Sequence, residues 1–181
     1  MSAELAILGL LVEQPLHGYG IERLIEARGM RKWTPIGFSS IYHILDQLVS
    51  AGLAEVRIEP APGRGRERHI HAATVQGQEL WERKTLAALS DVEGGPGKFL
   101  MALSGSPLLD QSDATAALAD RVAALETRLA DLERDLGAAR PVPTHVEVMF
   151  DFTRNHLRSE RAWVNCYLGD LTINDTQEGP P

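Results

Sequence analysis

Four polar side chains recur along one short segment in a pattern suited to hydrogen bonding with another molecule. The segment is "GFSSIYHILDQLVSAGL", residues 37–53, and the side chains are Ser39, Ser40, His43 and Gln47. Hydroxyl, imidazole and amide groups both donate and accept hydrogen bonds, without the fixed charge of Lys or Glu. Base edges in the major groove of DNA are read by such groups, an amide pairing well with adenine and a donor with guanine. The segment therefore predicts a surface that could hydrogen-bond to base edges, with an ordinary solvated helix face as the alternative.

The apolar residues of the same segment predict the element that presents these groups. They fall at i, i+3, i+4 and i+7, the spacing of one buried helix face: Ile41, Ile44, Leu45 and Leu48. Ser39 is a good N-cap residue and Gly52 favours a helix end, so we expect a helix between them. Tyr42 lies at the edge of its polar face.

The neighbouring segments predict a winged helix-turn-helix. Apolar periodicity indicates helices over residues 3–13 and after "HGYG", and Thr74 caps a fourth helix that continues to Leu89. Between the third and fourth helices, alternating residues around Val56 and Ile58 and a second run over residues 66–72 predict a hairpin. Three arginines mark the tip of this hairpin, the wing: Arg64, Arg66 and Arg68. They are expected to contact phosphate or the minor groove, although Arg68 could instead face a carboxylate such as Glu55.

Charge and cysteine usage limit the function further. The net charge of the 181 residues is −7, but residues 1–90 carry ten Lys/Arg and ten Asp/Glu, whereas residues 91–181 carry eight and fifteen. A phosphate-binding surface therefore remains compatible with the first half. The single cysteine, Cys166, fits a reducing cytoplasm; it is a candidate redox sensor, although thiols buried in helices are mostly inert. The early apolar run, residues 5–12, is too short to span a membrane.

Enzyme and metal chemistry are not expected. The chain contains no nucleophile elbow and no phosphate-binding glycine loop, so we expect neither catalysis nor a cofactor. His69 and His71 would share a strand face, but their spacing matches no standard ligand pattern, so we expect no metal there and place both toward solvent or a groove.

The second half of the chain predicts a helical dimerisation domain. We place the first domain at residues 1–92, a linker with a short helix at 93–113, the dimerisation domain at 114–171 and a flexible tail at 172–181. Residues in the first helix of this domain follow a heptad spacing: Leu118, Val122, Leu125, Leu129, Leu132 and Leu136. Arg121 with Glu126, and Arg128 with Glu133, are complementary across a parallel coiled coil. Packing of the same helix within its own subunit is the alternative.

The last long helix, from Thr144 to about Leu168, is apolar over much of its circumference and should be covered on two sides. One stripe is assigned to dimerisation: Phe150, Leu157 and Val164. A second stripe would either join the dimer core or line a pocket for a flat apolar effector: Met149, Phe152, His156, Trp163 and Tyr167.

These landmarks together resemble the PadR family of bacterial transcriptional regulators. "ILGLLVEQPLHGYGI" is similar to the family's opening motif, "SIYHILDQLVSAGLAEV" to its recognition helix, and "GRERHIHAATVQG" to its wing. Over residues 114–170 the likeness is architectural and points to the branch with two C-terminal helices. His43, Gln47 and Glu67 depart from the family pattern, which leaves the base preference open.

The resemblance implies a mainly α (α+β) fold and a DNA-binding regulator. We expect a cytoplasmic homodimeric repressor on a roughly palindromic DNA operator, released by a small aromatic or hydrophobic effector, with Tyr42 against the DNA backbone. The alternatives are a protein-interaction module without specific DNA binding and a metal-sensing repressor. The operator, the effector and the regulated genes cannot be read from the sequence.

Overall fold

The computed structural model describes residues 3–32, 36–60 and 67–177, with the side chains of residues 38–39 and 172–177 left out of the description. The chain divides into two compact units, Met1–Ala88 with Gly94–Asp110 and Leu89–Glu93 with Gln111–Pro181. Helices dominate both units, and the first contains a small sheet, as predicted. No helix in the described part of the chain is long and apolar enough to cross a membrane.

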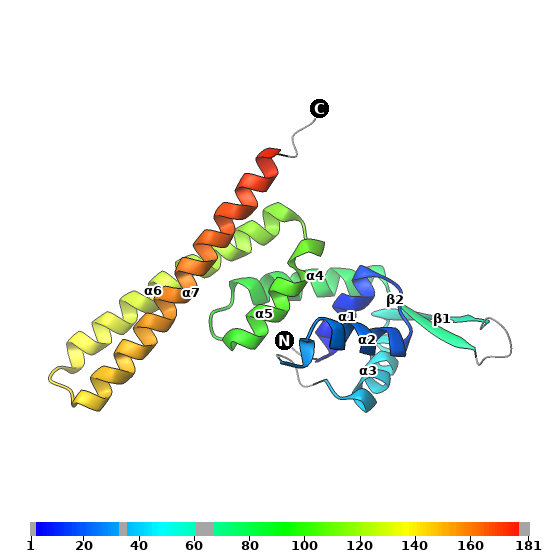
Figure 1. Ribbon diagram of the computed structural model, residues 1–181, viewed down its shortest axis with the longest axis horizontal. Helices are drawn as coiled ribbons and strands as arrows, with labels where there is room; N and C mark the ends of the chain where they lie inside the picture. The colour runs from blue at the N-terminus through cyan, green and yellow to red at the C-terminus, as the bar shows by residue number, and fades with distance from the viewer. Residues whose placement is uncertain (1–2, 33–35, 61–66, 178–181) are drawn as a thin grey trace. The chain divides into compact units, whose positions relative to one another are not determined.

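The first unit is a winged helix-turn-helix (Figure 1). Its elements in chain order are α1 (Ala3–Glu13), α2 (Gly18–Ala27), the 3-10 turn η1 (Met30–Lys32), α3 (Phe38–Ser50), β1 (Ala54–Glu59), β2 (Arg68–Ala73), α4 (Val75–Ser90), α5 (Gly95–Gly105) and the 3-10 turn η2 (Ser106–Leu108). The last two residues of α4 belong to the second unit. The order helix, helix, helix, hairpin, helix confirms the predicted fold.

The core of the first unit is built from the apolar faces that the sequence predicted. The largest fully buried aliphatic side chains come from all three N-terminal helices: Ile7, Leu8, Ile21, Ile25, Ile41 and Leu45. Burying one such side chain contributes about 1.5–3 kcal/mol, so the three helices hold each other in place mainly through this cluster.

Two glycines let α1 and α5 approach the ring of Trp81 on α4. A Cβ atom added to Gly9 or to Gly105 would lie 2.6 Å from an atom of the Trp81 indole. The indole is buried, with 3% of its residue surface exposed. Gly9, which interrupts the apolar run in the sequence, is therefore a packing residue.

The wing is held by a third backbone segment. β1 and β2 pair antiparallel, with Val56 opposite His71 and Ile58 opposite His69. Leu16 exchanges two backbone hydrogen bonds with His71, each 2.8 Å long, so the segment before α2 extends the sheet. The Thr74 hydroxyl donates to the Gly52 carbonyl at 2.7 Å and accepts the Gly77 N–H at 3.1 Å, which confirms the predicted cap of α4.

The second unit is a pair of long helices, α6 (Gln111–Ala139) and α7 (Thr144–Gln177), which run side by side in opposite directions (Figure 1). The helix predicted to end near Leu168 continues to Gln177, so the first part of the predicted tail is helical. Apolar residues of both helices close the seam between them. Leu118, Leu125, Leu136, Leu157 and Val164 are buried in the single chain, and Val122, Leu129, Leu132 and Phe150 are half-buried.

The charges that flank the heptad seam are paired within the chain. Arg121 pairs with Glu160 of α7. Arg128 lies 3.4 Å from the carboxylate of Glu93, and Arg161 lies 3.5 Å from Glu126. Glu133 accepts a hydrogen bond from Arg154 at 2.5 Å. Each of the four charges that the sequence predicted to pair across a parallel coiled coil thus has an oppositely charged neighbour within its own chain, and pairing between subunits stays a prediction.

Candidate nucleic-acid interface

The outer face of α3 presents the side chains that the sequence predicted as base readers. Tyr42, His43 and Gln47 are exposed, and Ser40 is half-buried. The Ser39 side chain lies outside the described residues. Asp46, which the sequence reasoning passed over, is exposed on the same face because it follows His43 by three residues. A carboxylate there accepts a hydrogen bond from cytosine and repels phosphate.

The start of α3 differs from the prediction. The N-cap residue is Gly37, which makes no side-chain capping bond, and its carbonyl accepts the Ser40 N–H at 3.2 Å. Ser39 is therefore a helical residue instead of the cap. Just before α3, the guanidinium of Arg31 donates to the Ile36 carbonyl and to Glu26 on α2. This arginine fixes the entry into α3, since Ile36 is itself buried.

Tyr42 is positioned by the first turn of α2. A Cβ atom on Gly18 would lie 2.6 Å from the Tyr42 ring, so only glycine allows the ring to lie this close. The α2 N-terminus is capped by an imidazole: His17 Nδ1 accepts the Gly20 N–H at 2.7 Å. Because Nδ1 accepts, the neutral ring carries its proton on Nε2. The "HGYG" motif thus caps α2 through His17 and, through Gly18, leaves the space in which the Tyr42 ring packs.

The wing contributes one described arginine to this face. Arg64 and Arg66 lie outside the described residues, and Arg68 is exposed at the start of β2. The strand register places Arg68 opposite Glu59, and Glu55 is instead paired with Arg57 at 2.6 Å. The carboxylate opposite Arg68 is thus that of Glu59 and not of Glu55, so the alternative that this arginine faces a carboxylate stays open.

The two wing histidines have different environments. His69 is exposed as expected, but His71 is buried, with 8% of its surface exposed, and its Nδ1 has no hydrogen-bond partner within the described residues. Burial lowers the pKa of His71, the charge of His69 adds to this effect, and Asp46 opposes it. Of the two positions expected for His71, solvent is wrong because the residue is buried, whereas a groove position agrees with its place in the lining of the hollow described below. No cluster of three metal-ligating side chains occurs in the described ranges.

A hollow of about 470 Å³ joins these elements on one side of the first unit. Its lining includes groups from α2, α3 and β2: His17, Tyr19, Tyr42, Asp46, Arg68 and His71. Aromatic, cationic and anionic groups all contribute to this lining. Such a surface suits a polar, patterned partner better than an apolar one.

The residues predicted to bind an effector lie on an open face of α7. Met149, Phe152 and Trp163 are 65%, 73% and 49% exposed, and His156 is also exposed. The Trp163 and half-buried Tyr167 rings stack with their centroids 5.4 Å apart. These residues form a face of one helix. Cys166 is exposed, contrary to the expectation of a buried thiol.

Several solved structures are similar to this chain. Bacillus subtilis PadR in complex with operator DNA is 19% identical, with 93% of this chain and 98% of that chain covered and a TM-score of 0.45. The same protein in complex with p-coumaric acid is 18% identical, with coverage of 93% and 98% and a TM-score of 0.41. A PadR-like transcriptional regulator from Bacillus cereus is 21% identical, with coverage of 94% and 98% and a TM-score of 0.42.

A comparison with curated proteins gives no match. A comparison with protein families matches the first unit. The matched residues are 7–83, and the family is described as the transcriptional regulator PadR-like family. The match begins in α1 and ends in α4, so it includes α3, the wing and the motifs that position Tyr42. The chain thus carries, over residues 7–83, a domain of the transcriptional regulator PadR-like family.

Proposed function

We propose that the protein is a sequence-specific DNA-binding transcriptional regulator that acts as a homodimeric repressor. One observation carries the proposal: α3 of a PadR-like domain presents Tyr42, His43 and Gln47 on an exposed face. An α-helix fits the major groove, where Gln47 is suited to adenine and His43 to guanine. Ser39 and Ser40, near the helix N-terminus, are assigned to phosphate or base contacts.

The wing supplies the electrostatic part of the affinity in this proposal. α3 carries no Lys or Arg, and its only acidic residue is Asp46. Arg64, Arg66 and Arg68 are therefore assigned to phosphate or minor-groove contacts. Neutralising phosphates releases counterions, so DNA binding should weaken steeply as salt increases.

The open face of α7 supports a homodimer. Val148, Met149, Phe152 and Trp163 together place four large apolar side chains in solvent on one helix. Exposed apolar surface of this kind marks interaction sites, and a second copy of the chain is the occupant we assign. The buried seam of α6 is already covered by α7, so we assign it to the fold of the subunit. Two winged units would then meet half-sites of a roughly palindromic operator.

The test is retention of the DNA upstream of the protein's own gene in a gel-shift assay at two salt concentrations. Replacing Gln47 by Ala should weaken specific binding by about fivefold to 150-fold, the loss expected for one bidentate base contact of 1–3 kcal/mol. The matched control is Gln78→Ala, an exposed glutamine on α4 whose amide donates to Glu82. A double Arg64→Ala/Arg66→Ala change should weaken DNA binding and reduce its salt dependence. Asp46→Asn should instead strengthen DNA binding, because it removes a charge that repels phosphate.

The competing function is a protein-interaction module that uses the winged unit and the helical pair without specific DNA binding. It is favoured if no duplex is retained specifically at low salt. Sedimentation analysis tests the dimer separately: Phe152→Glu should convert the dimer to a monomer, whereas Asn155→Glu, on an exposed position of the same helix turn, should leave it intact.

A further inference from the structure

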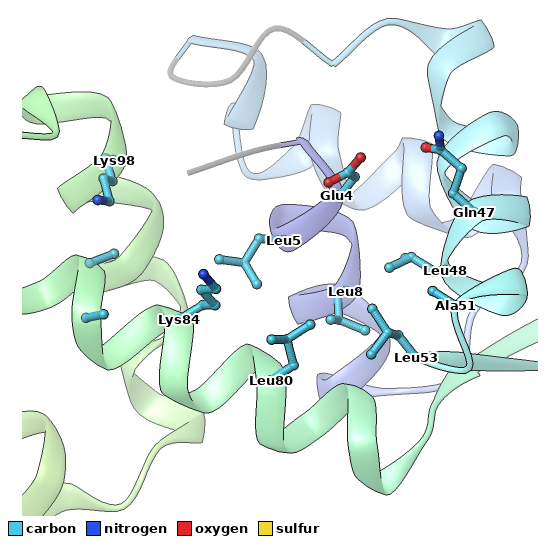
Figure 2. A pocket seen from close by; sticks show the side chains of 12 residues that line it. Glu4, Leu5, Leu8, Gln47, Leu48, Ala51, Leu53, Leu80, Lys84 and Lys98 are labelled. Carbon is cyan, nitrogen blue, oxygen red and sulfur yellow. The ribbon is translucent and has the colours of Figure 1, made fainter.

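Three of the six histidines of the chain line the hollow beside the face of α3 that we assign to DNA. They are His17, which precedes α2, and His69 and His71 on β2. The larger cavity of the same unit, about 660 Å³ in volume and shown in Figure 2, differs from it. Its described lining is mainly leucine and alanine and includes no histidine. The imidazole is the side chain whose charge changes near neutral pH, so the charge of the hollow depends on pH.

The fixed charges of the hollow are unfavourable for DNA. Arg68 is the one cation among its described lining residues, whereas Asp46 and Glu67 are both anions. While the imidazoles are neutral, the lining therefore carries an excess of negative charge, which repels phosphate. Tyr42, which we assign to the DNA backbone, lines the same hollow, so a duplex in contact with α3 brings phosphates to these groups. Protonation of one histidine cancels the excess charge, and protonation of a second reverses its sign.

His17 is held in its neutral form by the helix that it caps. Its Nδ1 accepts the Gly20 N–H at 2.7 Å, so a proton on that atom would remove the cap of α2. The Nε2–H of the neutral ring remains able to donate a hydrogen bond to an anion. His17 therefore supplies a donor and not a change of charge, which leaves His69 and His71 as the histidines of the hollow that can gain a proton.

His69 and His71 share one face of the wing but differ in exposure. The side chain of His69 is exposed, whereas His71 is 8% exposed and its Nδ1 has no hydrogen-bond partner within the described residues. Burial and the neighbouring His69 lower the pKa of His71, and Asp46 acts in the opposite direction. His71 is therefore neutral in the free protein near neutral pH, and a further anion over the hollow favours its charged form.

Few other charged groups face the two imidazoles. β1 faces them with Val56 and Ile58, which lie opposite His71 and His69 in the strand register. The charged residues of β1 alternate with these two and lie on the other face of the hairpin: Glu55, Arg57 and Glu59. The charged residues of α1 and α2 are not among the described lining residues: Glu4, Glu13, Glu22, Arg23 and Glu26. Two phenols complete the ionisable lining: Tyr19 and Tyr42. The charges that act on the pair are therefore the cation and the two anions named above.

We propose that DNA binding by this protein is coupled to proton uptake at His69 and His71, so that the duplex is bound tightly in mild acid and released as the pH rises. The proposal rests on the proposed DNA-binding function and concerns the regulation of that same surface. Phosphate over the hollow favours the charged imidazoles, and protons and DNA raise each other's affinity by the same factor because the linkage is reciprocal. Affinity gained in this way is present at low pH and is lost as the pH rises through the range in which the complex releases its protons.

The experiment measures the dissociation constant of the full chain for the duplex upstream of its own gene by fluorescence anisotropy at one salt concentration. The pH is varied between about 5.5 and about 8, the range in which histidine titrates. Uptake of one proton changes the affinity by up to about tenfold per pH unit, so the wild type should bind at least about tenfold more tightly at the acid end. Circular dichroism of every sample establishes that the protein is folded at that pH.

Three variants identify the groups that take up the protons. The double change His69→Gln/His71→Gln keeps neutral hydrogen-bonding groups, so it should bind like the wild type at the alkaline end and vary by less than about threefold over the whole range. His69→Gln alone, at an exposed position, should lose part of the pH dependence and keeps the test informative if the change at residue 71 impairs folding. Asp46→Asn should strengthen binding at the alkaline end and flatten the profile, because Asp46 favours the charged form of His71.

Two histidines outside the hollow serve as controls. His43→Gln, on the base-reading face of α3, should weaken binding at every pH and keep the wild-type slope, and His145→Gln, at an exposed position of α7, should match the wild type throughout. A slope that is lost in His43→Gln and kept in the folded double variant would overturn the proposal. DNA that is retained with an affinity independent of pH, or that binds more weakly in acid to a folded protein, refutes the coupling alone. A protein that retains no duplex at any pH refutes both the DNA-binding function and the coupling.

Discussion

Replacing Arg121 by methionine should strongly destabilise the second unit. The Arg121 side chain is 2% exposed although it carries a full charge, and its partner Glu160 is 22% exposed. Its Nε donates to Glu160 at 2.8 Å and its Nη2 donates to the same carboxylate oxygen, while its Nη1 donates to the backbone carbonyls of Leu89 at 3.3 Å and of Asp91. One guanidinium therefore joins α6, α7 and the end of α4 within this unit.

The size of the effect follows from these contacts. A hydrogen bond to a charged group contributes about 1.5–3 kcal/mol, and each carbonyl contact contributes about 0.5–1.5 kcal/mol. Removing one partner of a buried pair typically costs about 3–5 kcal/mol, because the other charge is left without compensation. Glu160 keeps some access to water, so we expect a loss at the lower end, about 3 kcal/mol.

The assay is native-state hydrogen exchange followed by mass spectrometry, since peptides from α6 and α7 report on this unit separately. The double change Arg121→Met/Glu160→Met should cost less than Arg121→Met alone, because no charge remains buried. Arg134→Met is the matched control: its pair with Asp131 lies at the surface, and its loss should leave exchange unchanged. A cost below about 1 kcal/mol for Arg121→Met would refute the reasoning.

Three further predictions concern the first unit and are read by urea unfolding. Gly77→Ala should destabilise it by about 3 kcal/mol, because the new Cβ would lie 2.0 Å from the Leu53 carbonyl oxygen and both atoms belong to fixed backbone. Thr74→Ala should cost about 1–2 kcal/mol through loss of the helix cap, and Thr74→Ser should restore most of it. The pKa of His71 is lowered from its ordinary value of 6.5 by burial, so the unfolded chain binds more protons as the pH falls below 6.5. Stability should therefore fall in that range, and His71→Gln should remove this part of the pH dependence; an unchanged profile in the variant would contradict it.

The fold could be predicted because each element of the first unit follows from a local pattern. Apolar spacing around Ile41 and Leu45 sets α3, and the Thr74 cap sets the start of α4. The predicted end of α7 is too early because Gly169 favours a helix end, whereas α7 continues through it. A glycine in a long helix costs about 1 kcal/mol, which the neighbouring helical residues can offset.

The site was predicted in part, and the errors share a cause. The exposure of His43 and Gln47 could be predicted because it depends on helix phase, and the period of a helix is known. Residues whose role depends on contacts between distant segments were not found. The backbone of His71 pairs with that of Leu16, and Arg121 contacts Glu160 and the end of α4. No spacing in the sequence predicts such pairings.

The faces of α3 explain how this helix can be fixed in the core and still present polar groups to a partner. Ile41 and Leu45 fix the helix in the core, so it cannot shift as a whole without losing their burial. Gln47 and Leu48 are neighbours in sequence and stand about 100° apart around the helix axis, which leaves Gln47 exposed and Leu48 buried. Replacing Gln47 should therefore change contacts with a partner and leave the burial of the helix intact.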